Sequence, residues 1–242
     1  SKDEAARSDC IIILSIDKKY NKIKVSSIMR DTYVKINGHG MTKINHAYAY
    51  GGPELAINTL NENLNMNITQ YVIADFEGLK NIIDTLGGVE IEIKSYEIPS
   101  MKYVGIYSPG KYNLNGTQAL AYSRIRYQGN GDYERTERQR IVLSKIISNI
   151  KDEKLSKYPQ LVEQLISNVE TNIKKADILK IGISIFTSKI EKIEMERFPR
   201  AGYCAGKIIN GVWYLVADLK ATTEQLHEYI WQDKSQDKNI KK

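Results

Sequence analysis

Residues 10–28, with the sequence CIIILSIDKKYNKIKVSSI, contain the longest nearly unbroken apolar run of the chain, which extends from Cys10 to Ile16. A polar KKYN segment separates this run from residues 22–28, in which Ile23 and Val25 alternate with polar residues. Two apolar segments of this kind on either side of a short turn predict a β-hairpin. We expect this hairpin to lie in the centre of a β-sheet.

Strands and helices alternate outward from this hairpin. Amphipathic or helix-entry patterns predict helices over residues 51–64, 76–86, 116–124, 133–151, 157–172, 176–188 and 218–231. Strands are predicted over residues 71–74, 89–93, 193–198 and 212–216, and residues 95–113 form an irregular stretch typical of a binding loop or lid. The pattern predicts one α/β domain over residues 1–232, with a mixed central sheet and helices on both faces, and a polar tail over residues 233–242.

The composition is that of a globular protein. The chain has 242 residues, 35 Lys+Arg against 29 Asp+Glu, a formal net charge of +6 and 42% hydrophobic residues, which excludes disordered, collagen-like and cysteine-rich classes. The apolar run at Cys10–Ile16 is far shorter than the roughly 18 to 20 residues that span a bilayer. Cys10 and Cys204 permit one disulfide and leave the compartment open. The histidines and cysteines lack zinc-ligand spacing, and no nucleotide-binding motif occurs.

Arginine is scarce and concentrated. The chain has 9 arginines, and 5 of them lie between Arg124 and Arg140. A guanidinium presents a rigid fork of donors that matches phosphate or carboxylate, which the point charge of lysine does not reproduce. The cluster indicates an anion site, and the alternative is a solvated face with salt bridges.

The helix that begins near Asp132 places polar side chains on the face that looks inward. At about 100° per residue, Asp132, Arg135 and Gln139 share one face, which Leu143, Ile146 and Ile150 continue. A buried charge needs a partner, because burying it alone costs several kcal/mol. These residues therefore form either part of a ligand site or an internal ion pair between Asp132 and Arg135.

The arginines before this helix have a related pattern. Arg124 and Arg126 would share a face if the backbone is extended there, and the sequence Gly129-Asn130-Gly131 favours unwinding. In that case both could converge with Arg135 on a phosphate or diphosphate. If the two strands of the hairpin are antiparallel, Asp9 and Arg30 lie at one end of the sheet. Asp9 is then either a Mg²⁺ ligand or a turn residue.

Six motifs in a fixed order carry a resemblance to a known family. They are residues 7–9 (RSD), 27–32 (SIMRDT), 43–52 (KINHAYAYGG), 86–89 (LGGV), 114–126 (LNGTQALAYSRIR) and 132–139 (DYERTERQ). This order closely resembles the LytR-CpsA-Psr family of bacterial cell-envelope proteins, over roughly residues 7 to 140.

The resemblance implies a phosphotransferase at the extracytoplasmic face of the cell membrane, held by an amino-terminal membrane helix. Family members transfer a glycopolymer, such as wall teichoic acid or capsular polysaccharide, from an undecaprenyl-diphosphate carrier to peptidoglycan as a phosphodiester. They hold the polyprenyl chain in an apolar pocket. By position, the diphosphate would be bound by Arg30, Arg124, Arg126, Arg135 and Gln139. Mg²⁺, or Mn²⁺, would be held at Asp9, and Asp132 would be a base or an organiser of the arginines.

The chain departs from the family pattern in two places. The family usually has a further strand with a second metal-site aspartate before the RSD motif, so we expect this strand and the membrane anchor to precede Ser1. Met29 replaces the usual proline before Arg30, for which we expect a local backbone change without loss of chemistry. Two alternatives remain, a lipid-diphosphate hydrolase and a non-catalytic binder of anionic envelope polymers. Nucleic acid is not an expected partner, because the arginines converge on an inward helix face.

Overall fold

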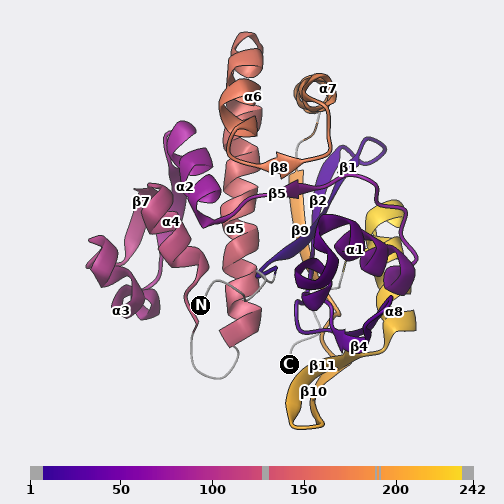
Figure 1. The fold of residues 1–242 in the computed structure, drawn as a ribbon. Coiled ribbons are helices and arrows are strands. Elements are labelled where there is room, and N and C mark those ends of the chain that lie inside the picture. Colours follow the sequence, from indigo (N-terminus) through magenta and orange to yellow (C-terminus); the bar gives the residue numbers. More distant parts are fainter. Residues whose placement is uncertain (1–7, 127–130, 189, 191, 236–242) are drawn as a thin grey trace. The chain divides into compact units, whose positions relative to one another are not determined.

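The computed structural model of the protein describes residues 8–126, 131–188, 190 and 192–235 (Figure 1). Contacts divide the chain into two compact units, unit 1 with residues 1–69 and 191–242 and unit 2 with residues 70–190. Each unit is a mixture of helices and strands, which confirms the α/β class. Within the described ranges, no helix has both the length and the apolar composition that a membrane span requires.

A three-stranded mixed sheet organises unit 1. Strand β1 (Ile11–Asp17) pairs antiparallel with β2 (Lys22–Ile28), and β2 pairs parallel with β9 (Lys192–Phe198). The predicted hairpin is confirmed, but only its second strand, β2, is central, and β1 is an edge strand of this sheet. Because Ile11 lies opposite Ile28, the chain enters β1 and leaves β2 at the same end of the sheet.

Two helices complete the core of unit 1. Helix α1 (His46–Leu64) packs against α8 (Leu219–Gln232), and residues from both helices join Ile13, Ile28 and Phe198 of the sheet in one buried cluster. The helical geometry of α1 is interrupted at Gly51 and Gly52, where φ of Gly52 is 61°. A positive φ favours glycine, so the Gly-Gly pair lets the chain change direction before Pro53 begins the regular helix. Two hairpins complete this unit, β3 (Tyr33–Ile36) with β4 (Gly40–Lys43) and β10 (Cys204–Ile209) with β11 (Val212–Ala217).

Unit 2 is built around the long helix α5 (Gly131–Asp152), drawn in pink in Figure 1. Its core combines Val142 and Ile146 of α5 with residues of β6 (Val89–Ile93), β7 (Gly110–Leu114), α2 (Phe76–Thr85) and α4 (Gly116–Ser123). The remaining regular elements are α3 (Ile98–Met101), α6 (Tyr158–Ile166), α7 (Lys175–Thr187) and the short pair β5 (Val72–Ile73) with β8 (Glu170–Thr171). Single helical turns at 95–97, 102–104 and 155–157 connect them.

The prediction that residues 95–113 are irregular was wrong. Ile98, Met101 and Ile106 are buried in the core of unit 2, and Gly110–Leu114 forms a strand against β6. The helix predicted over 157–172 ends at Ile166, because the chain then turns into β8. The strands β3, β4 and β10 were missed.

Candidate functional site

The end of β2 positions Arg30 through main-chain hydrogen bonds. The Met29 amide donates to the Phe198 carbonyl (2.9 Å), a bond that the usual proline cannot make, and the Asn45 amide donates to the Arg30 carbonyl (3.2 Å). The Thr32 hydroxyl donates to the Met29 carbonyl at 2.5 Å. The backbone that carries Arg30 is therefore fixed on both sides, while its side chain is still partly accessible.

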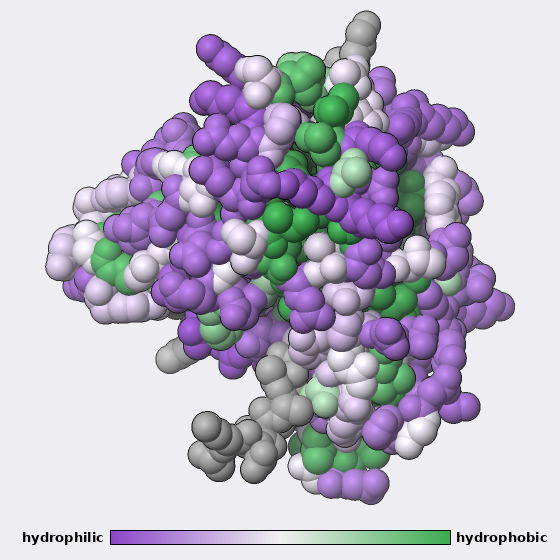
Figure 2. Space-filling view, turned by 45° about the horizontal axis from the view of Figure 1, so that its top comes forward, coloured by the Kyte–Doolittle hydropathy of each residue, from purple (hydrophilic) through white to green (hydrophobic). Residues whose placement is uncertain are grey.

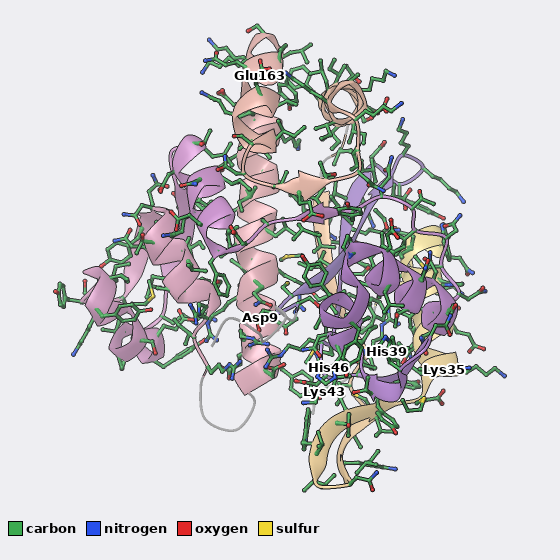
Figure 3. The ribbon with its side chains drawn as sticks, viewed as in Figure 1. Asp9, Lys35, His39, Lys43, His46 and Glu163 are labelled. Atoms are coloured by element: carbon green, nitrogen blue, oxygen red, sulfur yellow. The ribbon has the colours of Figure 1, made fainter. Side chains whose placement is uncertain are left out.

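Asp9 and Arg30 meet at this end of the sheet, as the antiparallel register predicts. Arg30 Nη1 lies 2.6 Å from Asp9 Oδ1, and Arg30 Nε lies 3.5 Å from Asp31 Oδ2. Lys43 Nζ lies 2.8 Å from the other oxygen of Asp31. Asp9 and Lys43 are both labelled in Figure 3. Asp31 was not among the predicted site residues. Its carboxylate contacts both Arg30 and Lys43 and so holds these two cations next to each other.

Helix α4 delivers Arg124 to the surface of unit 2. The helix begins with a capping box, in which the Gln118 amide donates to Asn115 Oδ1 (2.9 Å) and the Asn115 amide donates to Gln118 Oε1 (3.2 Å). It ends at Ser123, and Arg124 is its exposed C-cap. The guanidinium of Arg124 lies over the ring of Phe76, 4.8 Å from the ring centroid, which limits its orientations.

Arg124 and Arg126 lie on either side of the buried residue Ile125. Ile125 is buried in the core of unit 2, and both arginines are exposed on either side of it. The helix ends at Ser123, but Arg124 has φ and ψ of −101° and −4°, so the extended backbone that was one of the two alternatives is not present at Arg124. In the described part of the chain, neither guanidinium is in an ion pair with a carboxylate. The segment therefore offers two adjacent cations to solvent.

The polar residues predicted on the inward face of α5 occupy different environments. Arg135 is buried, and its Nη2 lies 3.0 Å from Oδ1 of the partly exposed Asp132. The internal ion pair considered from the sequence is therefore present. Gln139 is half-buried. Asp132 and Arg135 occupy the first turns of the helix, where a carboxylate also interacts favourably with the helix dipole.

The sequence patterns did not predict a buried ion pair between Arg138 and Glu97 in unit 2. Arg138 Nε donates to Glu97 Oε1 (2.8 Å), and Arg138 Nη1 donates to the Ile125 carbonyl (3.2 Å). Burial alone would lower the pKa of Arg138, but the hydrogen bond and negative charge of Glu97, together with Tyr122 and Glu134, outweigh this effect and raise the pKa. Burial also raises the pKa of the neighbouring Tyr122 hydroxyl. Arg138 thus links α5 to the segment that carries Arg124 and Arg126.

Asp9 can contribute one oxygen ligand to a metal ion. Within residues 8–126, 131–188, 190 and 192–235, no group of three or more His, Cys, Asp or Glu side chains is arranged to hold a metal. Mg²⁺, however, binds through one or two carboxylates, substrate phosphates and waters. The half-exposed carboxylate of Asp9 fits this requirement. Asp3 and Glu4 lie outside the described residues.

The predicted site residues are thus divided between the units. Asp9 and Arg30 belong to unit 1, whereas Arg124, Arg126, Asp132, Arg135 and Gln139 belong to unit 2. Asp9 and Arg30 lie at one end of the sheet, as predicted, and Asp132 and Arg135 form the ion pair that was the alternative to a ligand site. The convergence of the two groups on one anion stays a prediction.

Known proteins share this arrangement of elements. A polyisoprenyl-teichoic acid–peptidoglycan teichoic acid transferase TagU of Enterococcus faecalis is 33% identical over 228 residues, which cover 93% of this chain and 73% of that protein. The structure of TagT, a Bacillus subtilis protein, bound to LI-WTA matches with a TM-score of 0.79, 27% identity and coverage of 94% of this chain and 86% of that chain. TagT with bound octaprenyl pyrophosphate lipid matches with a TM-score of 0.75, 27% identity and the same coverage.

The family model described as the LytR_cpsA_psr family matches residues 1–229. This match covers both units and all six sequence motifs. The chain therefore belongs to the LytR-CpsA-Psr family.

Proposed function

We propose that this protein transfers a glycopolymer from a polyprenyl-diphosphate carrier to peptidoglycan and joins them through a phosphodiester. The relative TagU is named for a transfer of this kind, and TagT has been solved with lipid-linked wall teichoic acid and with octaprenyl pyrophosphate. Wall teichoic acid, capsular polysaccharide or a related polymer fits the donor. Such a reaction takes place at the outer face of the cell membrane, where the carrier lipid and the wall meet.

The observation that carries this proposal is the pair of exposed arginines around Ile125. Arg135 and Arg138 are buried and form ion pairs, Arg135 with Asp132 and Arg138 with Glu97. Arg124 and Arg126 lack such carboxylate partners among the described residues. Two guanidinium forks that are not already neutralised are suited to a diphosphate, whose oxygens accept bidentate hydrogen bonds.

Arg30 is a further candidate ligand of the diphosphate, on the basis of its place in the SIMRDT motif. In the structure its guanidinium is shared between Asp9 and Asp31. Mg²⁺, or Mn²⁺, held by Asp9 would neutralise charge on the diphosphate oxygens and on the leaving phosphate. With Asp9 engaged by a metal, more of the Arg30 fork would be available to phosphate, while Asp31 would continue to orient it.

One face of the three-stranded sheet supports a site for the polyprenyl chain. The strand register places Leu14, Val25 and Met195 in one row across β1, β2 and β9, with Ile16, Ile23 and Ile193 in the next. Leu14 is 50% exposed and Met195 is 38% exposed, although both are large apolar side chains. Val25 and Ile23 on the central strand are fully buried, so the exposed apolar surface lies at the two edge strands. Exposed apolar side chains of this kind suit a hydrocarbon chain better than water.

The proposed reaction is a substitution at phosphorus. The hydroxyl oxygen of the peptidoglycan acceptor forms a bond to the phosphorus that bears the glycopolymer, and the bond from that phosphorus to the bridging oxygen breaks. Polyprenyl monophosphate leaves with the electron pair, and the hydroxyl proton passes to a base. Arg30, Arg124 and Arg126 stabilise the developing charge. The ion pair with Arg135 supports a role for Asp132 in orienting the arginines. Asp132 is also our candidate for the base that accepts the hydroxyl proton.

Calorimetry with a polyprenyl diphosphate tests the site assignment. We expect tight binding to the full chain, and we expect it to weaken both on chelation of Mg²⁺ and on the substitution Arg124→Ala. The substitution Lys111→Ala, which removes an exposed cation from β7, is the matched control and should leave binding unchanged. Binding that is absent, or that is indifferent to both Arg124 and metal, would overturn the assignment.

A further inference from the structure

The β10–β11 hairpin of unit 1 has an unusual surface composition. Between Arg200 and Asp218 the chain contains one charged residue, Lys207, and no acidic residue. The hairpin nevertheless projects into solvent, since Ile208 is 75% exposed, Trp213 is 46% exposed and Val212 is 44% exposed. Hydrophobic residues are visible on this hairpin at the lower edge of Figure 2. Hairpin tips in water are normally polar, so these side chains require a partner.

The geometry of the turn shows that both faces of the hairpin tip are apolar. Asn210 and Gly211 have φ values of 50° and 77°, which is typical of the tight Asn-Gly turn of two-residue hairpins. Ile208 lies opposite Trp213 on one face, and Ile209 lies opposite Val212 on the other. A hairpin that only covered a protein core would need one apolar face. This tip is suited to immersion in an apolar medium.

Trp213 is held at the boundary between this tip and the charged part of unit 1. A Cβ atom at Gly206 would lie 2.8 Å from Nε1 of Trp213, so the indole ring packs closely over the glycine backbone. Lys43 Nζ lies 5.8 Å from the centre of the Trp213 ring system and 2.8 Å from Asp31 Oδ1. An amphipathic indole next to lysine, below a group of aliphatic side chains, is the arrangement found at membrane interfaces.

The base of the hairpin is attached to the segment that carries Arg30. The Leu215 amide donates to the Asp31 carbonyl (2.9 Å), and Thr32 forms a β-bridge with Leu215. Leu215 is three positions after Val212 in the sequence, which corresponds to about 10 Å of extended strand. A surface that contacts the tip is therefore close to the arginine that we assign to the diphosphate.

We propose that the β10–β11 hairpin inserts its tip into the interface of an anionic lipid bilayer. The choice of a bilayer rests on the proposed function, because a polyprenyl carrier resides in a membrane, and contact at the hairpin would bring Arg30 to the level of its phosphates. Lys207 on the hairpin and the absence of carboxylates between Ala201 and Ala217 complement anionic head groups. Aliphatic Ile208 and Val212 favour lipid over sugar, which would need flat aromatic rings flanked by polar groups.

The two tryptophans of the chain permit a direct test with an internal control. Trp213 is on the hairpin, and Trp231, which is 50% exposed, is on α8. Full-length Trp231→Phe and Trp213→Phe proteins each retain one tryptophan. With vesicles of phosphatidylglycerol and phosphatidylcholine that carry dibrominated acyl chains and no polyprenyl diphosphate, we expect the fluorescence of Trp213 to shift to the blue and to be quenched. The fluorescence of Trp231 should change much less.

Co-sedimentation with the same vesicles completes the test. Ile208→Ser and Val212→Ser should each lower the partition coefficient by about tenfold, the effect of withdrawing one aliphatic side chain from lipid. Val72→Ser, at a position that is 58% exposed in unit 2, should have no effect. All variants should keep the thermal unfolding midpoint of the parent.

Three results would overturn the proposal: equal quenching of both tryptophans, partition that is unaffected by the hairpin substitutions, or a hairpin-dependent dimer in sedimentation without lipid binding. Because the vesicles contain no diphosphate, the result is separate from that of the calorimetry. Vesicle binding through the hairpin would stand even if diphosphate binding failed.

Discussion

Arg138 and Glu97 form an ion pair in which both side chains are almost fully buried, and Arg138 also contacts the segment that carries Arg124 and Arg126. Both side chains are almost fully buried, and the guanidinium also bonds to the carbonyl of Ile125 between the two exposed arginines. A buried ion pair is costly to break from one side, because the remaining charge has lost its partner. The pair therefore matters for stability and for the geometry of the anion site.

We predict that Glu97→Gln lowers the free energy of unfolding by about 3 to 5 kcal/mol. Chemical denaturation monitored by circular dichroism measures this change. The matched control is Glu163→Gln, which removes an exposed carboxylate paired with Lys175 and should cost no more than about 1 kcal/mol. Equal effects of the two substitutions would contradict the structural role given to Glu97.

A second residue-level prediction concerns stability against pH in unit 1. Lys24 is fully buried, and its Nζ lies 2.7 Å from Asp17 Oδ2 and 3.1 Å from Asp233 Oδ1. Burial alone would raise the pKa of Asp17, but hydrogen bonds from Lys24 and from the amides of Tyr20 and Lys19 outweigh it and lower the pKa. Because the folded pKa is below the unfolded value of about 3.9, this stabilisation is present above pH 4 and is lost as the pH falls through the folded pKa.

Asp17→Asn should therefore destabilise the protein at pH 7, and the difference from wild type should shrink progressively below about pH 4. Urea denaturation over a pH series measures both quantities. Asp177→Asn, which removes an exposed partner of Lys180 on α7, should leave the pH profile unchanged. A difference between Asp17→Asn and wild type that is constant from pH 7 to pH 3 would contradict the interpretation.

Residue-level contacts could be predicted where register determines them. Asp9 and Arg30 flank paired strands, so antiparallel pairing alone brings them together. Asp132 and Arg135 are one helical turn apart, which is equally local information. Glu97 and Arg138 are 41 residues apart in different elements, and no periodicity connects them. A nearly fully buried glutamate has no local signature in the sequence.

At the level of elements, the motif LNGTQ owes its residue types to the start of α4. Asn115 and Gln118 form the capping box, and the Gly116 amide donates to Asp84 Oδ1 (2.7 Å). A Cβ atom at Gly116 would lie 2.4 Å from the Lys80 carbonyl oxygen of α2. Glycine at this position thus permits close packing of two helices, one of which has Arg124 as its C-cap and the other of which begins at Phe76.

We predict that Gly116→Ala lowers the free energy of unfolding by about 1 to 3 kcal/mol, because the main chains of α2 and α4 must separate. The same change should weaken polyprenyl diphosphate binding, since Phe76 and Arg124 are carried by these helices. Calorimetry and denaturation measure the two effects. Thr117→Ala, one residue along on the exposed side of the helix, is the control and should alter neither.

Elements were predicted well where periodicity is strong and poorly where pairing is non-local. The amphipathic helix α2 and the alternating strand β6 begin where the sequence places them. Strand β10 was missed because Cys204–Lys207 has little apolar alternation, although Asn210-Gly211 before the strand at Val212 is a hairpin signal. Residues 95–113 contain Gly, Pro and Tyr, which suggested a loop, but packing of Ile98 and Met101 orders them.

At the level of the molecule, the class was predictable from the alternation of elements, and the family from six ordered motifs. The division into two units was not predicted, because no linker or composition change marks residues 69–70 or 190–191. The division depends on contacts between segments that are far apart in the sequence. Strand β9 follows more than a hundred residues of unit 2 and yet pairs with β2 in the sheet of unit 1.

The apolar sheet face makes a prediction about the donor lipid. Leu14→Glu should weaken binding of a long polyprenyl diphosphate, because the chain would contact a charge on the row formed by Leu14, Val25 and Met195. Binding of a short-chain prenyl diphosphate, which relies on the arginines, should be unaffected. Parallel calorimetry with the two ligands measures this split. An equal loss of affinity for both ligands would show that the polyprenyl chain does not bind at this face of the sheet.

The proposed transfer is tested by identifying the products that form when a labelled polyprenyl-diphosphate glycan is incubated with the protein, peptidoglycan and Mg²⁺. We expect equimolar polyprenyl monophosphate and a glycan joined to peptidoglycan through a phosphodiester, with both products greatly reduced in Arg124→Ala and retained in Lys111→Ala. Release of polyprenyl monophosphate together with free glycan phosphate, and without the conjugate, would show that the protein is a hydrolase and not a transferase.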